Sequence, residues 1–184
     1  MRSLELSISD LPPLAVLDTI LHSASNLQSF GLYVNTSAPL PQSILDVAGR
    51  LTRLRLTDGG DKLKSSCPSC LPLLAACTGL RSLHLIGWKV GIVAEMLRAC
   101  RSKLVGLTTT SLVEDDSAVY PHRPLRNALG FSSLAKLKRW RVSWSNDSSL
   151  VGGDEWRRAC ETRGIEVRGE ECYFTGELPT DSPP

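Results

Sequence analysis

One short pattern of leucines recurs along most of the chain. The pattern L-x-x-L-x-L is complete at residues 51–56 and 80–85, and residues 27–32 match it with Phe30 in place of the second leucine. Weaker copies begin at Met1, Leu104 and Leu137, and residues 165–167 form a last remnant. The first six copies start at residues 1, 27, 51, 80, 104 and 137, so successive starts are 26, 24, 29, 24 and 33 residues apart.

The spacing and the alternation predict the fold. Apolar residues alternate with polar ones inside each copy, which is typical of a strand with one buried face. Segments with a helical apolar stripe lie between copies, at residues 14–21, 41–50, 71–77, 92–100 and 154–163. Repeated strand–helix–strand order predicts a parallel sheet with right-handed crossovers, and units that cannot bury their own leucines must stack. We therefore expect an α/β leucine-rich repeat solenoid, a right-handed horseshoe of about six to seven irregular repeats with a parallel sheet on its concave face.

An ordinary doubly wound α/β domain is the alternative fold. Helices would then cover both sheet faces, and the strands would be continuous apolar runs. Every clear strand in this sequence alternates with polar residues, which favours a sheet with one open face. We assign residues 1–168 to the repeat domain and residues 169–184 to an acidic, proline-containing tail.

Composition narrows the classes of partner. The net charge of +2 argues against a strongly cationic nucleic-acid-binding protein, and aromatic residues that could stack on bases make up only 5%. The N-terminus lacks the apolar core of a signal peptide, and the uncharged stretch at residues 65–80 is interrupted by Pro68 and Pro72. Six cysteines are too few for a disulfide-stapled scaffold. We expect a cytoplasmic or nuclear protein with no membrane partner and no nucleic-acid partner.

The repeats resemble a known family. The copies at Leu27, Leu51 and Leu80, and the lead-in Cys77-Thr78-Gly79-Leu80, resemble the leucine-rich repeat part of fungal F-box proteins, as does the closing segment at residues 160–167. The resemblance covers about residues 1–167. It implies a protein–protein interaction module, the substrate-recognition part of an F-box type ubiquitin ligase receptor. A Skp-type adaptor would bind only if an F-box lay upstream, because residues 11–17 are interpreted as the helix of the first repeat.

Candidate chemistry is sparse, so we expect a protein that is not an enzyme and has no cofactor and no metal. Cys67-Pro68-Ser69-Cys70 resembles a glutaredoxin-type motif in those four residues, and a helix start can lower the pKa of the first thiol. A polar loop at residues 57–66 precedes the motif where a redox fold would place a strand. A thiol oxidoreductase is therefore the less favoured alternative, beside a free-standing leucine-rich repeat scaffold or inhibitor.

The alternation also predicts which residues face the open side of the sheet. Side chains with a period of two put the second, third, fifth and seventh residues of each copy on that face. Positive charge then gathers there, with Lys138 beside the arginines and Arg163 and Arg168 added by the last copy, while Glu5 and Glu166 lie near the ends. Trp88, just after a strand, is expected at the rim as an anchor for a partner. The candidate partner-binding residues are Arg53, Arg55, Arg81, His84, Trp88, Arg139 and Arg141.

Three of these residues share one position of the repeat. Arg55, His84 and Arg141 are fifth residues of their copies and should form one column across the sheet, with Thr108 between His84 and Arg141. Guanidinium groups pair well with carboxylates and phosphates, which favours an acidic or phosphorylated protein or peptide as the partner. The alternative is that these charges only keep the open face solvated.

Overall fold

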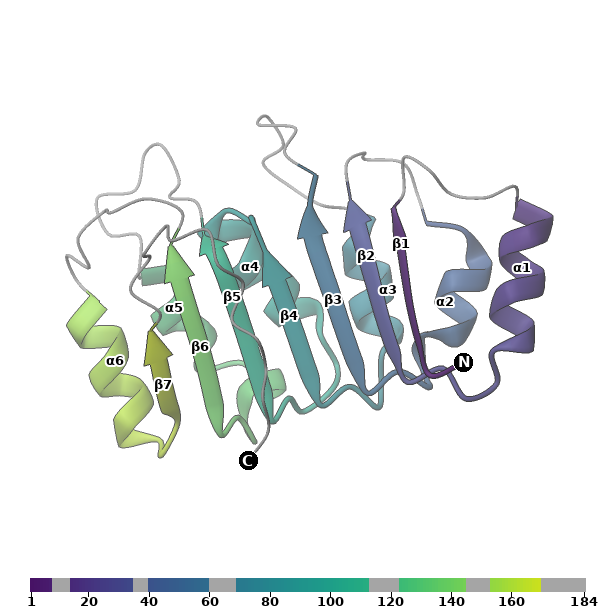
Figure 1. The fold of residues 1–184 in the computed structure, drawn as a ribbon. Coiled ribbons are helices and arrows are strands. Elements are labelled where there is room, and N and C mark those ends of the chain that lie inside the picture. The colour runs from purple at the N-terminus through teal and green to yellow at the C-terminus, as the bar shows by residue number, and fades with distance from the viewer. Residues whose placement is uncertain (8–13, 35–39, 60–68, 113–122, 145–152, 170–184) are drawn as a thin grey trace, which may run out of the picture.

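The computed structural model describes residues 1–7, 14–34, 40–59, 69–112, 123–144 and 153–169, and a single parallel sheet runs through all these segments (Figure 1). Its seven strands are hydrogen-bonded in sequence order, and each pairs in parallel with the next. This arrangement confirms the predicted adjacency of the strands near Leu27, Leu51, Leu80 and Leu104. The strands are β1 (Ser3–Ser7), β2 (Ser29–Val34), β3 (Arg53–Asp58), β4 (Ser82–Ile86), β5 (Gly106–Leu112), β6 (Arg139–Trp144) and β7 (Glu166–Gly169).

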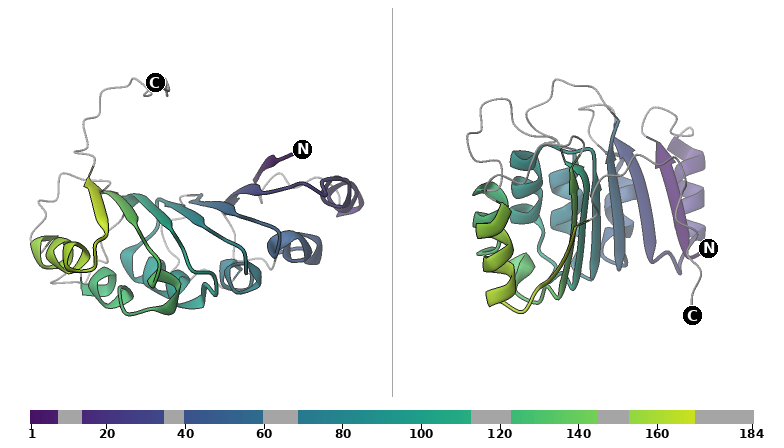
Figure 2. Two further views of the ribbon diagram at one scale, coloured as in Figure 1. Left: turned by 90° about the horizontal axis from the view of Figure 1, so that it is seen from below. Right: turned by 60° about the vertical axis from the view of Figure 1, so that its left-hand side comes forward.

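All the helices that the structure describes lie on one side of this sheet. Seen from below, the helices follow the outer side of a shallow arc and the strands its inner side (Figure 2). The other face of the sheet is uncovered by any described helix. The helices are α1 (Leu14–Ser23), α2 (Gln42–Ala48), α3 (Cys70–Ala76), α4 (Val90–Ala99), α5 (Arg123–Ala128) and α6 (Gly153–Thr162), with a 3-10 turn η2 (Ser132–Leu134).

Five of these helices were predicted from the sequence, whereas α5 and η2 were not. The predicted helices agree with the observed ones to within two residues at each end. The helix α5 is only six residues long and buries just Leu125 and Ala128, so it carries no apolar stripe that could be recognised.

Leucines fill the layer between sheet and helices. The first leucine of each clear copy lies two residues before its strand and is buried in the turn that leads into it. Met1 holds the same position in the first copy, yet its side chain is 58% exposed. Leu4 and Leu6 are likewise only partly buried, so the apolar layer thins toward β1.

Two local contacts shape the turns that lead from helices into strands. Ser102, in the turn after α4, donates its hydroxyl to the carbonyl oxygen of Cys77 and accepts the N–H of Leu80 at 2.9 Å, so it joins two neighbouring turns. At the end of α6, Gly164 has a φ of 68°, and the N–H of Ile165 donates to the carbonyl of Cys160. This is the left-handed ending that favours glycine, and it turns the chain directly into β7.

Candidate functional site

The open face of the sheet carries rows of side chains that the strand register defines. Partners in the register place the fifth residue of each copy beside the fifth residue of the next. The predicted column of Arg55, His84, Thr108 and Arg141 is therefore confirmed. In full, the row is Glu5, Gly31, Arg55, His84, Thr108, Arg141 and Arg168, from β1 to β7.

Two pairs of arginines stand on this face. Arg53 and Arg55 project from β3, and Arg139 and Arg141 project from β6, all four exposed to solvent. The two strands between them carry shorter groups in the same two rows: Ser82 and His84 on β4, and Gly106 and Thr108 on β5. Arg81 and Lys138 are exposed in the turns just before β4 and β6.

At the β7 end, one glutamate engages two arginines. Glu166 lies opposite Arg139 in the register, and its carboxylate is 3.4 Å from the Arg139 guanidinium. The same carboxylate lies 2.7 Å from the guanidinium of Arg168 on its own strand. Arg139 is on the adjacent strand and Arg168 is two residues away on β7, so the Glu166 side chain does not have to cross a strand to contact either.

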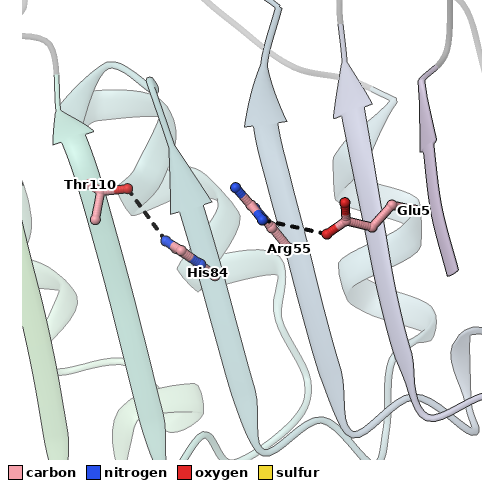
Figure 3. A network of polar contacts seen from close by, with 4 residues as sticks. All are labelled: Glu5, Arg55, His84 and Thr110. Atoms are coloured by element: carbon pink, nitrogen blue, oxygen red, sulfur yellow. Dashed lines mark hydrogen bonds and ion pairs between the residues drawn. The ribbon is translucent and has the colours of Figure 1, made fainter. Parts of the chain in front are cut away.

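At the β1 end, a glutamate reaches across a whole strand. Glu5 on β1 contacts Arg55 on β3, with 3.4 Å between its Oε1 and the Arg55 Nη1, and β2 lies between them (Figure 3). The β2 residue in this row is Gly31, and a Cβ atom there would lie only 2.8 Å from the Glu5 Cγ. The Glu5 side chain therefore lies over Gly31 in the space that a larger residue would fill.

A pocket of about 200 Å³ opens at this crossing. Its walls include Glu5, Arg55 and Tyr33, a residue that is 44% exposed, and Gly31 lies at the crossing point. It joins a carboxylate, a guanidinium and an aromatic ring on the open face.

His84 lies at the centre of the row. Its Nε2 is 3.4 Å from the Thr110 Oγ1, and the two groups share a hydrogen bond (Figure 3). Partial burial, followed by repulsion from the Arg55 and Arg141 charges, lowers the pKa of His84 below its ordinary value of 6.5. The lowered pKa favours the neutral imidazole at pH 7, so the positive charge of this row comes mainly from the arginines.

Three predictions about the open face were wrong. Trp88 is buried, only 4% exposed, because its Nε1 donates to the carbonyl of Leu56 at 3.0 Å and its ring joins the core. Arg163 lies in the turn after α6 and donates to the carbonyl of Leu129 just past α5, so it is not part of the sheet. Ser143, in the seventh position of its copy, is also buried, where the register between β5 and β6 shifts.

The four cysteines that the structure describes are buried. Cys70 is the first residue of α3 and is buried, whereas Cys67 and Pro68 lie outside the described residues. Burial raises the pKa of Cys77 and of Cys160 to about 12, and it also raises the pKa of Cys100. Over the described ranges, no group of three or more His, Cys, Asp or Glu side chains is placed to hold a metal ion.

Sequence reasoning did not anticipate the contact between Glu5 and Arg55. The available signal was a glycine at the fifth position of one copy, with an acid at that position in the copy before and a base in the copy after.

The chain was compared with family models, with curated proteins and with solved structures, and no match was found in any of the three. Within the part of the chain that the structure describes, no helix has the length and apolar character needed to cross a membrane.

Proposed function

We propose that this chain is a leucine-rich repeat type recognition module whose open sheet face binds an acidic or phosphorylated segment of a partner protein. The observation that carries the proposal is that two pairs of arginines, Arg53 and Arg55 on β3 and Arg139 and Arg141 on β6, stand on one face that no described helix covers. Arginine forks bind carboxylates and phosphates with two parallel hydrogen bonds, which gives both affinity and orientation.

The spacing of the two pairs suits an extended segment. Neighbouring strands lie ~4.8 Å apart, so the three intervals from β3 to β6 span roughly 14 Å. An extended chain advances about 3.3 Å per residue, so a peptide laid across the strands would present acidic groups roughly four residues apart to the two pairs. The short Ser82, Gly106 and Thr108 side chains leave its backbone room between them.

The resemblance to fungal F-box proteins adds a role to this surface. On that basis the partner is a substrate of an F-box type ubiquitin ligase, and a Skp-type adaptor would be recruited by an upstream F-box. A free-standing repeat scaffold or inhibitor would use the same face. Buried free thiols at Cys77, Cys100 and Cys160 suit the reducing conditions of the cytoplasm or nucleus.

A charge-reversal pair tests the proposal. Arg55→Glu with Arg141→Glu should abolish the capture of acidic or phosphorylated proteins and the binding of a fluorescein-labelled hexaglutamate peptide. The matched control is Arg157→Glu with Arg158→Glu, which makes the same charge change at exposed positions of α6 in the helix layer. Binding should also weaken as salt rises, because the Debye length is only ~8 Å at physiological ionic strength. Equal binding by the two double variants would show that the arginines only solvate the face.

A further inference from the structure

Resting on this proposed function, we infer that the Arg55 guanidinium is the subsite for one carboxylate side chain, Asp or Glu, of the bound segment, and that Glu5 occupies it as an internal stand-in until the partner displaces it. We infer a carboxylate ligand because the group that contacts Arg55 in the structure is itself a carboxylate, that of Glu5.

The contact between Glu5 and Arg55 is long and exposed to solvent, so another carboxylate can replace Glu5. Its single donor–acceptor distance is 3.4 Å, and the two side chains are 70% and 49% exposed. Exposed ion pairs of this kind are screened by solvent and give little stability, so a competing carboxylate has little to overcome. A partner carboxylate that approaches from solvent can instead take the two-bond geometry that Glu5, stretched over β2, does not make.

Gly31 is what allows the internal occupant to reach Arg55. A Cβ at position 31 would lie 2.8 Å from the Glu5 Cγ and 3.2 Å from its Oε1, so alanine would push the carboxylate off its path. The φ of Gly31 is not in the positive region, and the alanine can therefore adopt the same backbone conformation. The clash is with a flexible, exposed side chain, which can move aside without disturbing the sheet.

The glutamate at the other end of the sheet reaches its arginines in a different way. Glu166 bridges Arg139 and Arg168 from an adjacent strand, without crossing a glycine. At the β1 end, by contrast, the glycine lies between the acid and the arginine of one row, beside a pocket of about 200 Å³.

The test measures binding of fluorescein-labelled hexaglutamate by fluorescence anisotropy, with hexaglutamine as the neutral comparison. Glu5→Gln should tighten hexaglutamate binding by up to about two-fold, the gain that releasing a weak exposed ion pair allows. Gly31→Ala should produce a gain of the same size without changing the charge. The double variant should bind no more tightly than either single variant, because both changes release the same arginine.

Glu155→Gln is the matched control. It removes the same charge from an exposed ion pair with Arg126 in the helix layer, and it should leave hexaglutamate binding unchanged. Equal gains from Glu5→Gln and Glu155→Gln would mean a general charge effect and would overturn the inference. So would gains from Glu5→Gln and Gly31→Ala that add in the double variant, or a gain from Glu5→Gln without one from Gly31→Ala.

The outcomes also separate this inference from the proposed function. If wild type binds hexaglutamate, the Arg55→Glu and Arg141→Glu variant does not, and Glu5→Gln changes nothing, the open face binds acids but Glu5 is no stand-in. If wild type, Glu5→Gln and Gly31→Ala all fail to bind hexaglutamate, both the proposed function and the inference are wrong.

Discussion

On the helix side of the sheet one row of side chains stays apolar from strand to strand, whereas on the open side the neighbouring row varies in charge and size. One helix-side row is apolar at all seven strands: Leu4, Phe30, Leu54, Leu83, Leu107, Trp140 and Val167. The next row on the open side runs through acid, glycine, arginine, histidine, threonine and two arginines. Neighbouring residues of the same strands thus obey different constraints.

The difference follows from burial. Residues on the helix side must fill the space beneath α1 to α6, so any polar or undersized substitution leaves an unsatisfied group or a cavity. Residues on the open side need only remain hydrated, and their identities can vary without cost to the fold. Only the side chains of the open face can therefore vary to suit a binding partner.

The largest expected effect comes from a pair of adjacent residues on β6 that point to opposite faces. Trp140 is fully buried, packs edge-to-face on Trp156 with ring centroids 5.1 Å apart, and donates its Nε1 to the Thr109 hydroxyl. Trp140→Ala should lower the free energy of unfolding by about 3–5 kcal/mol, which is typical of a deleted core aromatic. Arg141→Ala, one residue away, should change it by less than about 1 kcal/mol. Urea unfolding of both variants measures the difference, and similar losses would contradict the contrast between faces.

A smaller effect is expected in the turns that feed the strands. Ser102→Ala leaves the N–H of Leu80 and the carbonyl of Cys77 without their buried partner, which should cost about 1–3 kcal/mol of unfolding free energy. Ser82→Ala is the control, because Ser82 is half-buried on the open face, and its loss should be within about 0.5 kcal/mol. A larger loss of unfolding free energy for Ser82→Ala than for Ser102→Ala would mean that side chains of the open face stabilise the fold.

The helix side is also the part that the sequence predicted well. Alternating leucines with a repeating start specify both the strands and their order, because only one register buries every leucine. The exception is α5, where only Leu125 and Ala128 are buried and no periodic signal exists. The strand starts also differ from the starts of the leucine pattern. Each strand begins two residues after the first leucine of its clear copy, because that leucine is buried in the preceding turn.

The open face was predictable in its rows but not in its contacts. The column of Arg55, His84 and Arg141 follows from the repeat position, which the leucines fix. The Glu5–Arg55 pair joins residues 50 positions apart and depends on a rotamer and on the missing Cβ of Gly31, neither of which periodicity encodes. Trp88 was wrongly predicted at the rim because it comes just after a strand. Its indole N–H instead donates to the Leu56 carbonyl on the neighbouring strand.

A pH titration should reveal the one histidine of the row. The pKa of His84 is lowered in the fold, so the unfolded chain takes up its proton first as pH falls below 6.5. Stability should therefore fall as pH drops below that value and level off once folded His84 is protonated. The groups that face it are Arg55 from β3, Thr110 from β5 and Arg141 from β6. His84→Gln should remove this part of the pH dependence, measured by urea unfolding between pH 7.5 and pH 5 and by NMR titration of the imidazole; an unchanged profile would contradict the assignment.

The smallest expected effect separates the two glutamates that hold arginines on the open face. Glu166 contacts two guanidinium groups, one at 2.7 Å, whereas the contact from Glu5 to Arg55 across β2 measures 3.4 Å. Both pairs are exposed, so Glu166→Gln should cost up to about 1 kcal/mol of unfolding free energy and Glu5→Gln only a few tenths. The ordering matters because the proposed displacement of Glu5 from Arg55 requires a carboxylate that contributes little to the stability of the fold. Unfolding in urea at low and at 1 M salt measures both variants, and the Glu166→Gln loss should shrink as salt screens the pair. A cost above about 1 kcal/mol for Glu5→Gln would mean that the crossing over Gly31 holds β1 on the sheet, and Glu5 would then be a structural residue.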